Sequence, residues 1–218
     1  QNVDNFIKSI SKNKKIDFLV IVNPSHPFEH FWKKKEIEKI LKFTKKKQIT
    51  VLLDEVYLAY QNLSVINLIN KFDHLIVLKS LSKIPGLPGL RVGFAFSNKK
   101  IVDELSTTRL AIELPEYNVR KATKYISNPN KFINNRLRMI NLARSFAHKE
   151  FSKRNVQSFG EYGNSVSAYI NNASKIKKIG DYMMKNKIMI NYKYSPPFDK
   201  YINITTTNRQ NIQFFFKI

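Results

Sequence analysis

The stretch HLIVLKSLSKIPGLPGLRVGFAF, residues 74–96, places a polar loop rich in glycine and proline between two apolar runs. The runs His74–Leu78 and Val92–Phe96 are rich in β-branched, aromatic and other apolar residues, which is typical of buried strands. An ordinary core offers little room for charged or hydroxyl groups at such a place. The loop between the two runs nevertheless carries Ser80, Ser82, Lys83 and Arg91.

Strand-like and helix-like segments alternate before and after this stretch. This rhythm predicts an α/β fold with a mostly parallel sheet that helices cover on both faces. The predicted strands upstream are Asp17–Val22 and Ile49–Leu53, and the predicted helices are Lys33–Lys46, Leu63–Asn70 and Asn98–Ser106.

The pattern changes near residue 128, where Pro129 is followed by a long helical stretch that reaches about Arg154. We therefore expect two domains, 1–128 and 129–218, of which the second is a small α+β lobe. Beyond the long helix we expect strands at Ser165–Ile170, Ile188–Asn191 and Tyr201–Thr205, a helix at Ser174–Lys185 and a terminal helix.

The composition excludes several classes of protein. The 218 residues contain no cysteine, so disulfides and thiolate metal sites are ruled out. The four histidines are scattered without ligand-like spacing, and we expect no metal site. No apolar run approaches the roughly 20 residues that a membrane span needs. A cytoplasmic protein without a membrane partner is expected.

A net charge of +22 raises the question of nucleic-acid binding. The charge comes mainly from lysine, whereas base recognition depends on arginine. The lysine runs at 33–35 and 45–47 also lie at the two ends of one predicted helix, where they solvate its surface. We therefore expect no nucleic-acid partner.

Ligands of open parallel sheets bind at the carboxyl ends of the strands. Here the strand ends bring together an acid, a lysine, two hydroxyls and an arginine. A lysine amine can form an imine with a carbonyl, and an aspartate can stabilise a protonated ring nitrogen. Arginine and hydroxyl groups suit a phosphate dianion. The residues concerned are Asp54 and Tyr57 of the DEVY segment, Ser80, Ser82, Lys83 and Arg91.

The segment SLSKIPGLPGLRVGF, residues 80–94, resembles the lysine motif of histidinol-phosphate aminotransferases and threonine-phosphate decarboxylases. These proteins are members of the class I/II superfamily of fold-type I enzymes that use pyridoxal 5'-phosphate (PLP). In that family the motif lysine is followed eight residues later by a phosphate-binding arginine, an interval that Lys83 and Arg91 keep. DEVY is similar to the Asp-Glu-Ala-Tyr/Phe element of the family, and GNSV at Gly163–Val166 is similar to a small-domain strand whose asparagine borders the pocket.

The resemblance implies the PLP-dependent transferase fold (fold type I): the later part of a large PLP-binding domain followed by a small C-terminal domain. It implies an aminotransferase that acts through an internal aldimine of Lys83 on a small amine or amino-acid substrate, with or without a phosphate group, in a homodimer. It also implies roles for single residues: Asp54 at the pyridinium nitrogen, Tyr57 and His26 at the phenolic oxygen, Ser80, Ser82 and Arg91 at the phosphate, and Asn164 and Asn203 at the substrate.

Two regions depart from the pattern of this family. His26 stands where the family has the asparagine of its Asn-Pro-Thr-Gly loop, and Phe28-Glu29 replace the Thr-Gly that follows. Asn203 stands where the family has the arginine that binds the substrate carboxylate. A neutral amide cannot form that bidentate pair, so we expect poor handling of α-amino acids and a gain from Asn203→Arg.

The resemblance covers only the later part of a family member. The preceding region of such proteins is expected to supply a glycine-rich helix start for the phosphate and an aromatic ring that stacks on the cofactor. Two other functions stay open: a PLP-dependent decarboxylase of a phosphorylated amino acid, and a catalytically silent aminotransferase-like module. Plainer roles also fit the residues: a helix N-cap for Asp54, a core ring for Tyr57, a solvated side chain for Lys83, a surface ion pair for Arg91, turn residues for Ser80 and Ser82, and an inert loop side chain for His26.

Overall fold

The computed structural model describes residues 2–13, 15–110 and 114–217, which form two compact units. The first unit comprises Gln1–His26 and His30–Pro129. The second comprises Asn130–Ile218 together with the short segment Pro27–Glu29. The division after Pro129 lies one residue from the boundary expected from sequence, whereas nothing in the sequence indicated that Pro27–Glu29 belongs with the second unit.

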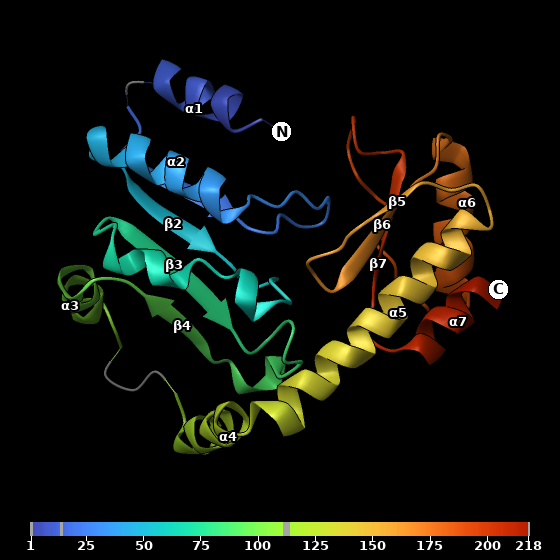
Figure 1. Cartoon of the computed structure of the whole chain (residues 1–218). Helices are drawn as coiled ribbons and strands as arrows, with labels where there is room; N and C mark the ends of the chain where they lie inside the picture. The colour runs from blue at the N-terminus through green and yellow to red at the C-terminus, as the bar shows by residue number, and fades with distance from the viewer. Residues whose placement is uncertain (1, 14, 111–113, 218) are drawn as a thin grey trace. The chain divides into compact units, whose positions relative to one another are not determined.

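The first unit holds the parallel strands and the helices that follow them (Figure 1). Two of its helices, α1 (Val3–Lys12) and α4 (Glu116–Ser127), were not predicted, and the helix expected at 63–70 is replaced by two 3-10 turns. In chain order its elements are α1 (Val3–Lys12), β1 (Phe18–Val22), α2 (Lys34–Lys46), β2 (Thr50–Asp54), η1 (Gln61–Leu63), η2 (Ile66–Asn70), β3 (Leu75–Ser80), η3 (Pro88–Leu90), β4 (Gly93–Phe96), α3 (Lys99–Thr107) and α4 (Glu116–Ser127).

The sheet of the first unit has the order β1-β2-β3-β4. Strands β1, β2 and β3 are parallel, and β4 runs antiparallel to β3, with Ser80 opposite Gly93. The carboxyl ends of the three parallel strands therefore meet the amino end of β4 at one edge. The mostly parallel α/β sheet predicted from the sequence is confirmed.

One face of this sheet is buried by α2 and the η2 turn. The α2 side chains Ile37, Ile40 and Leu41 are at most 1% exposed and pack in one cluster with the inward residues of β2 and β3. On the other face of β1, alternate side chains are exposed: Phe18, Val20 and Val22. The prediction that helices cover both faces is thus wrong for β1 within the described residues.

The second unit is an antiparallel sheet with helices packed on one face. Its helices bury Val166, Ala168, Ile202 and Ile204, so the alternate residues of the same strands turn to the opposite face. Its elements are η4, a π-helical turn (Asn130–Asn134), α5 (Asn135–Ser152), β5 (Ser158–Phe159), β6 (Ser165–Tyr169), α6 (Ala173–Lys185), β7 (Tyr201–Thr205) and α7 (Arg209–Lys217).

The strand expected at Ile188–Asn191 does not form. Only Asn191 pairs, as an isolated bridge to Asn203, and the neighbouring Met189 is 85% exposed. The chain then enters a loop that contains Pro196 and Pro197, whose nitrogens cannot donate to a ladder. Strand β5 was not predicted. Within the described residues, no helix combines the length and the apolar character that crossing a membrane requires.

Candidate active site

Seven residues predicted to bind a cofactor or react lie at the same edge of the first unit's sheet. The end of β1 leads to His26, the end of β2 to Asp54 and Tyr57, and the end of β3 to Ser80. The loop that follows joins β3 to β4, so its residues return to this edge. The loop residues in question are Ser82, Lys83 and Arg91.

The rings of His26 and Tyr57 stack, with centroids 4.3 Å apart and planes 10° apart. The Lys83 Nζ lies 5.0 Å from the Tyr57 ring centroid, at cation–π distance. Burial, and secondly the charge of Lys83, lower the pKa of His26 below its ordinary value. A neutral imidazole carries one N–H donor and one acceptor, which suits a hydrogen bond to an oxygen. Lys83 itself is exposed in this chain.

Asp54, the last residue of β2, opens a turn. Its Oδ1 accepts the backbone N–H of Val56 at 2.9 Å, a contact that fixes the carboxylate beside the strand end. Because the side chain is only half-buried, the carboxylate remains at the surface of the sheet edge. This is the position from which an aspartate can meet a ring nitrogen.

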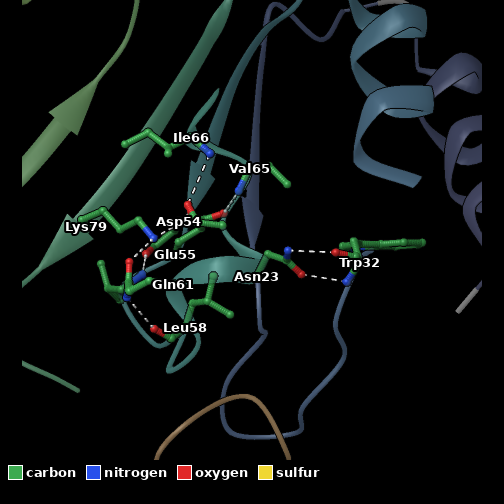
Figure 2. A network of polar contacts seen from close by, with 11 residues as sticks. Asn23, Trp32, Asp54, Glu55, Leu58, Gln61, Val65, Ile66 and Lys79 are labelled. Atoms are coloured by element: carbon green, nitrogen blue, oxygen red, sulfur yellow. Dashed lines mark hydrogen bonds and ion pairs between the residues drawn. The ribbon is translucent and has the colours of Figure 1, made fainter. Parts of the chain in front are cut away.

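The neighbouring Glu55 has a structural role that the sequence did not reveal. Its side chain is 0% exposed and forms a 2.6 Å ion pair with Lys79 of β3 (Figure 2). The same carboxylate accepts the hydroxyl of Ser64 at 2.5 Å and the N–H of Val65 at 2.9 Å. A carboxylate held by three partners fastens the turn after β2 to the adjacent strand, and so supports Asp54.

The loop from β3 to β4 is ordered by its own backbone and hydroxyls. Ser80 Oγ accepts the N–H of Ser82 at 3.0 Å. Arg91 adopts the left-handed conformation, with φ 53°, and its guanidinium donates to the Pro88 carbonyl at 3.2 Å. Arg91 is exposed, and its guanidinium has further donors for a phosphate.

The loop after β1 has a stem that belongs to the first unit. Asn23 is fully buried; its amide donates to the Trp32 carbonyl at 3.1 Å and accepts the Trp32 N–H at 2.7 Å (Figure 2). Next along the stem, Ser25 and His30 exchange hydrogen bonds of 2.8 and 2.9 Å. The stem therefore holds the chain on both sides of Pro27–Glu29, which we call the loop tip.

The two predicted substrate-binding residues lie in the second unit. Asn164 is half-buried, and its carbonyl accepts the N–H of Thr206 at 2.8 Å. Asn203 is 1% exposed; its amide donates to Ser167 Oγ at 2.9 Å and to the Pro27 carbonyl at 3.3 Å. The described residues include no group of three or more His, Asp or Glu side chains suited to a metal ion.

The match to known families covers nearly the whole chain. Residues 1–214 match the model of the family described as "Aminotransferase class I and II". The chain belongs to the class I and II aminotransferase family. Membership of this family accounts both for the fold and for the lysine motif at the sheet edge, because the motif recognised in the sequence is one that this family carries.

The curated relatives of this aminotransferase-family chain include histidinol-phosphate aminotransferases. One from Thermoanaerobacter pseudethanolicus is 35% identical over 127 residues, which are 58% of this chain and 33% of the relative. One from Clostridium kluyveri is 26% identical over 215 residues, 96% of this chain and 58% of the relative. The chain thus spans a third to somewhat over half the length of these relatives.

Solved structures show the same fold at low sequence identity. A putative histidinol-phosphate aminotransferase from Erwinia carotovora atroseptica matches with a TM-score of 0.88 and 19% identity, covering 99% of this chain and 62% of that one. L-threonine-O-3-phosphate decarboxylase from Porphyromonas gingivalis matches with a TM-score of 0.73 and 20% identity, covering 92% and 62%. A histidinol-phosphate aminotransferase from Sinorhizobium meliloti, solved with pyridoxal-5'-phosphate, matches with a TM-score of 0.86 and 17% identity, covering 99% and 59%. The fold-type I assignment is therefore confirmed.

The residues at the sheet edge fit PLP chemically. They offer one amine, one carboxylate, a neutral imidazole stacked on a phenol, and hydroxyls with a guanidinium. PLP has a carbonyl, a ring nitrogen, a phenolic oxygen and a phosphate, so each of its groups has a matching partner type among them.

Proposed function

We propose that the full-length protein is a PLP-dependent aminotransferase that transfers an amino group to or from a small amine, with or without a phosphate group, with Lys83 as the attachment lysine. The observation that carries the proposal is the grouping of Lys83, Tyr57 and His26 at the end of the parallel strands, where Asp54 also lies. When bound, PLP supplies an electron sink for the bonds at the substrate Cα.

Each side chain at the edge has a task in this proposal. Lys83 Nζ would hold the cofactor through its amine, and the same amine would accept the proton from the substrate Cα and carry it. Asp54 holds the proton on the ring nitrogen, because a carboxylate stabilises that charge. Tyr57 and the neutral His26 donate to the phenolic oxygen. Ser80, Ser82 and Arg91 bind the phosphate.

The residues of the second unit favour substrates without an α-carboxylate. Asn203 carries no charge, and the two N–H groups of its amide already bond to Ser167 and Pro27. Arg209, the nearest arginine in the sequence, lies at the start of α7 with its guanidinium 5.1 Å from the Phe146 ring. Amino alcohols and simple amines are therefore better candidates than glutamate or alanine.

The attachment test uses the full-length protein with PLP. After reduction with borohydride and digestion, mass spectrometry should find the pyridoxyl mass on the Lys83 peptide, and Lys83→Arg should abolish it. Lys99→Arg is the matched control, since Lys99 is an exposed lysine of α3. Label spread over surface lysines with none at Lys83 would refute the proposal and favour a catalytically silent module.

A decarboxylase of a phosphorylated amino acid is the second candidate, because the KSLSK segment and the fold also resemble threonine-phosphate decarboxylase. Product analysis separates the two functions: an aminotransferase returns a carbonyl product and an aminated cofactor, whereas a decarboxylase releases carbon dioxide. The proposal also includes a homodimer, which light scattering of the full-length protein tests directly; a monomer that binds PLP tightly would exclude it.

A further inference from the structure

The loop tip is held in the second unit by three separate groups of contacts. The Pro27 carbonyl accepts the Ser167 hydroxyl at 2.8 Å as well as the Asn203 amide. The Phe28 ring stacks on Phe198 with centroids 4.4 Å apart, and the rings of Tyr194 and Tyr201 lie in T-shaped contact with it, with centroids 5.0 and 4.9 Å away. These contacts leave the third residue of the tip, Glu29, facing the turn before β6.

The Glu29 carboxylate is bound by backbone N–H groups of this turn. Its carboxylate accepts the backbone N–H of Glu161, the N–H of Tyr162 with both oxygens at 3.0 Å, and the N–H of Gly163 at 2.9 Å. Successive backbone N–H groups that converge on one carboxylate form the kind of concavity that binds anions in proteins. We call residues 160–163 the receptor turn.

The receptor turn is also held by side chains other than Glu29. Two α5 side chains one helical turn apart bind its carbonyls: Arg144 donates to the Gly163 oxygen at 2.7 Å, and a His148 ring nitrogen lies 2.9 Å from the Gly160 oxygen. Arg144 is 6% exposed, so a buried positive charge lies at the base of the turn. Gly160 has φ 123°, a conformation that a residue with a side chain rarely adopts.

We propose that the receptor turn is a binding site for a small carboxylate, and that Glu29 occupies it as a built-in ligand and keeps ligand carboxylates out. The converging N–H groups mark the turn as an anion site, and the contacts of Arg144 and His148 with its carbonyls fix the backbone that presents them. A ligand carboxylate in the second unit then meets neither an arginine at position 203 nor unoccupied N–H groups at the turn. The exclusion of substrate carboxylates rests on the function proposed above; the anion site does not.

The binding test removes Glu29 and supplies acetate to the full-length protein. Labelling tyrosine carbonyls with ¹³C and glycine nitrogens with ¹⁵N selects the amides of Tyr-Gly pairs. Tyr162-Gly163 is the one such pair in these 218 residues, and its signal is the one that Tyr162→Phe removes. In Glu29→Ala, acetate should shift this signal saturably, at concentrations on the order of millimolar. The native protein should show no shift. Glu104→Ala, which removes an exposed acidic side chain of α3, is the control for net charge and should behave like the native protein.

Three outcomes would overturn the anion site. The first is no acetate shift in Glu29→Ala, and the second is an equal shift in native protein and Glu29→Ala. The third is a Gly163 signal that, in Glu29→Ala without acetate, has the chemical shift of a disordered residue. The last would mean that Glu29 creates the turn instead of filling it. Glu29→Gln, which keeps the shape but not the charge, should respond to acetate less than Glu29→Ala.

The specificity test compares alanine with 2-aminopropan-1-ol, which differ only in carboxylate against hydroxymethyl. In PLP-loaded Glu29→Ala, the ratio of the rate with alanine to the rate with the amino alcohol should rise about tenfold, the effect of roughly 1.4 kcal/mol. An unchanged ratio beside positive acetate binding would overturn the exclusion alone. If PLP fails to attach to Lys83 in any variant, the proposed function fails, and the acetate titration still decides the anion site.

Discussion

In the first unit, the candidate side chains Lys83 and Arg91 are exposed, whereas in the second unit Asn203 is buried and bonded within the protein. Lys83 lies over the Tyr57 ring, and the Arg91 guanidinium donates to the Pro88 carbonyl at the sheet edge. Asn203 is 1% exposed, with its amide hydrogens bonded to Ser167 and Pro27, and Glu29 fills the receptor turn. A polar residue at a strand end is therefore no guide to ligand binding by itself; what matters is whether the chain already uses its hydrogen-bonding groups.

Removing the amine of the exposed site should have the largest effect. In Lys83→Ala the transferred proton loses its carrier, and such proton transfer contributes about 10²–10⁴-fold to a rate. Turnover of the best amine should fall by at least that factor, measured in single turnovers of full-length protein. Added methylamine should restore part of the lost rate by standing in for the side chain. A variant that keeps near-native turnover would show that another group does the chemistry.

Breaking the buried ion pair beneath the site should be the largest change in stability. Glu55→Gln leaves the charge of Lys79 without its anion, in a place where Lys79 is 15% exposed, and should lower the free energy of unfolding by about 3 kcal/mol. Urea denaturation measures this loss. Asp103→Asn breaks the exposed Lys99–Asp103 pair and should cost less than about 0.5 kcal/mol. Equal losses of stability in the two variants would mean that burial does not strengthen the contribution of the Glu55–Lys79 pair to stability.

Introducing the family's arginine at position 203 of the second unit should have a moderate effect on stability and on the rate with alanine. The sequence suggested that Asn203→Arg improves handling of α-amino acids. The structure adds a cost of about 1–3 kcal/mol, because a larger charged group replaces a buried amide that pairs with Ser167 and Pro27.

In Asn203→Arg, Glu29 still occupies the N–H groups of the receptor turn. We therefore expect little increase in the rate with alanine until Glu29 is removed as well. Thermal unfolding and the rate with alanine measure the two effects. Thr205→Arg, at an exposed position two residues along the same strand, is the control and should unfold like the native protein. A large gain with alanine in Asn203→Arg alone, without loss of stability, would contradict this account.

The smallest effect concerns pH. Because the pKa of His26 is lowered by burial and by Lys83, the folded chain binds fewer protons there than the unfolded chain. Stability should therefore fall as the pH drops below about 6.5, the ordinary histidine value, and the loss should level off below the lowered pKa. His26→Asn should remove part of this slope in denaturation curves recorded between neutral and acidic pH.

Another histidine tests whether the slope belongs to His26. Burial, as the largest cause, lowers the pKa of His74 too, so part of the slope should survive in His26→Asn and disappear further in the double variant with His74→Asn. A slope unchanged by His26→Asn would mean that His26 becomes protonated as easily in the folded chain as in the unfolded one.

The local pattern of the sequence carries much of the first unit. Apolar runs of strand length, a helix with apolar spacing and the loop with its fixed lysine–arginine interval predicted the α/β sheet and the edge where Lys83 and Arg91 lie, because strand periodicity and turn chemistry act over a few residues. The same reasoning was wrong at 188–191, since an apolar run forms a strand only when a neighbour can pair with it, and only Asn191 does so.

By itself, the sequence determined the family, the fold class and the candidate lysine, since these depend on residue types at short, fixed spacing. Only the tertiary structure decided that Glu55 is a buried support and that the loop tip belongs to the second unit. It also decided that Glu29, 132 to 134 residues away from its partners in the chain, fills a receptor of backbone N–H groups. Such contacts leave little trace in sequence, because every residue except proline carries the same N–H, and only the folded chain decides which of them converge.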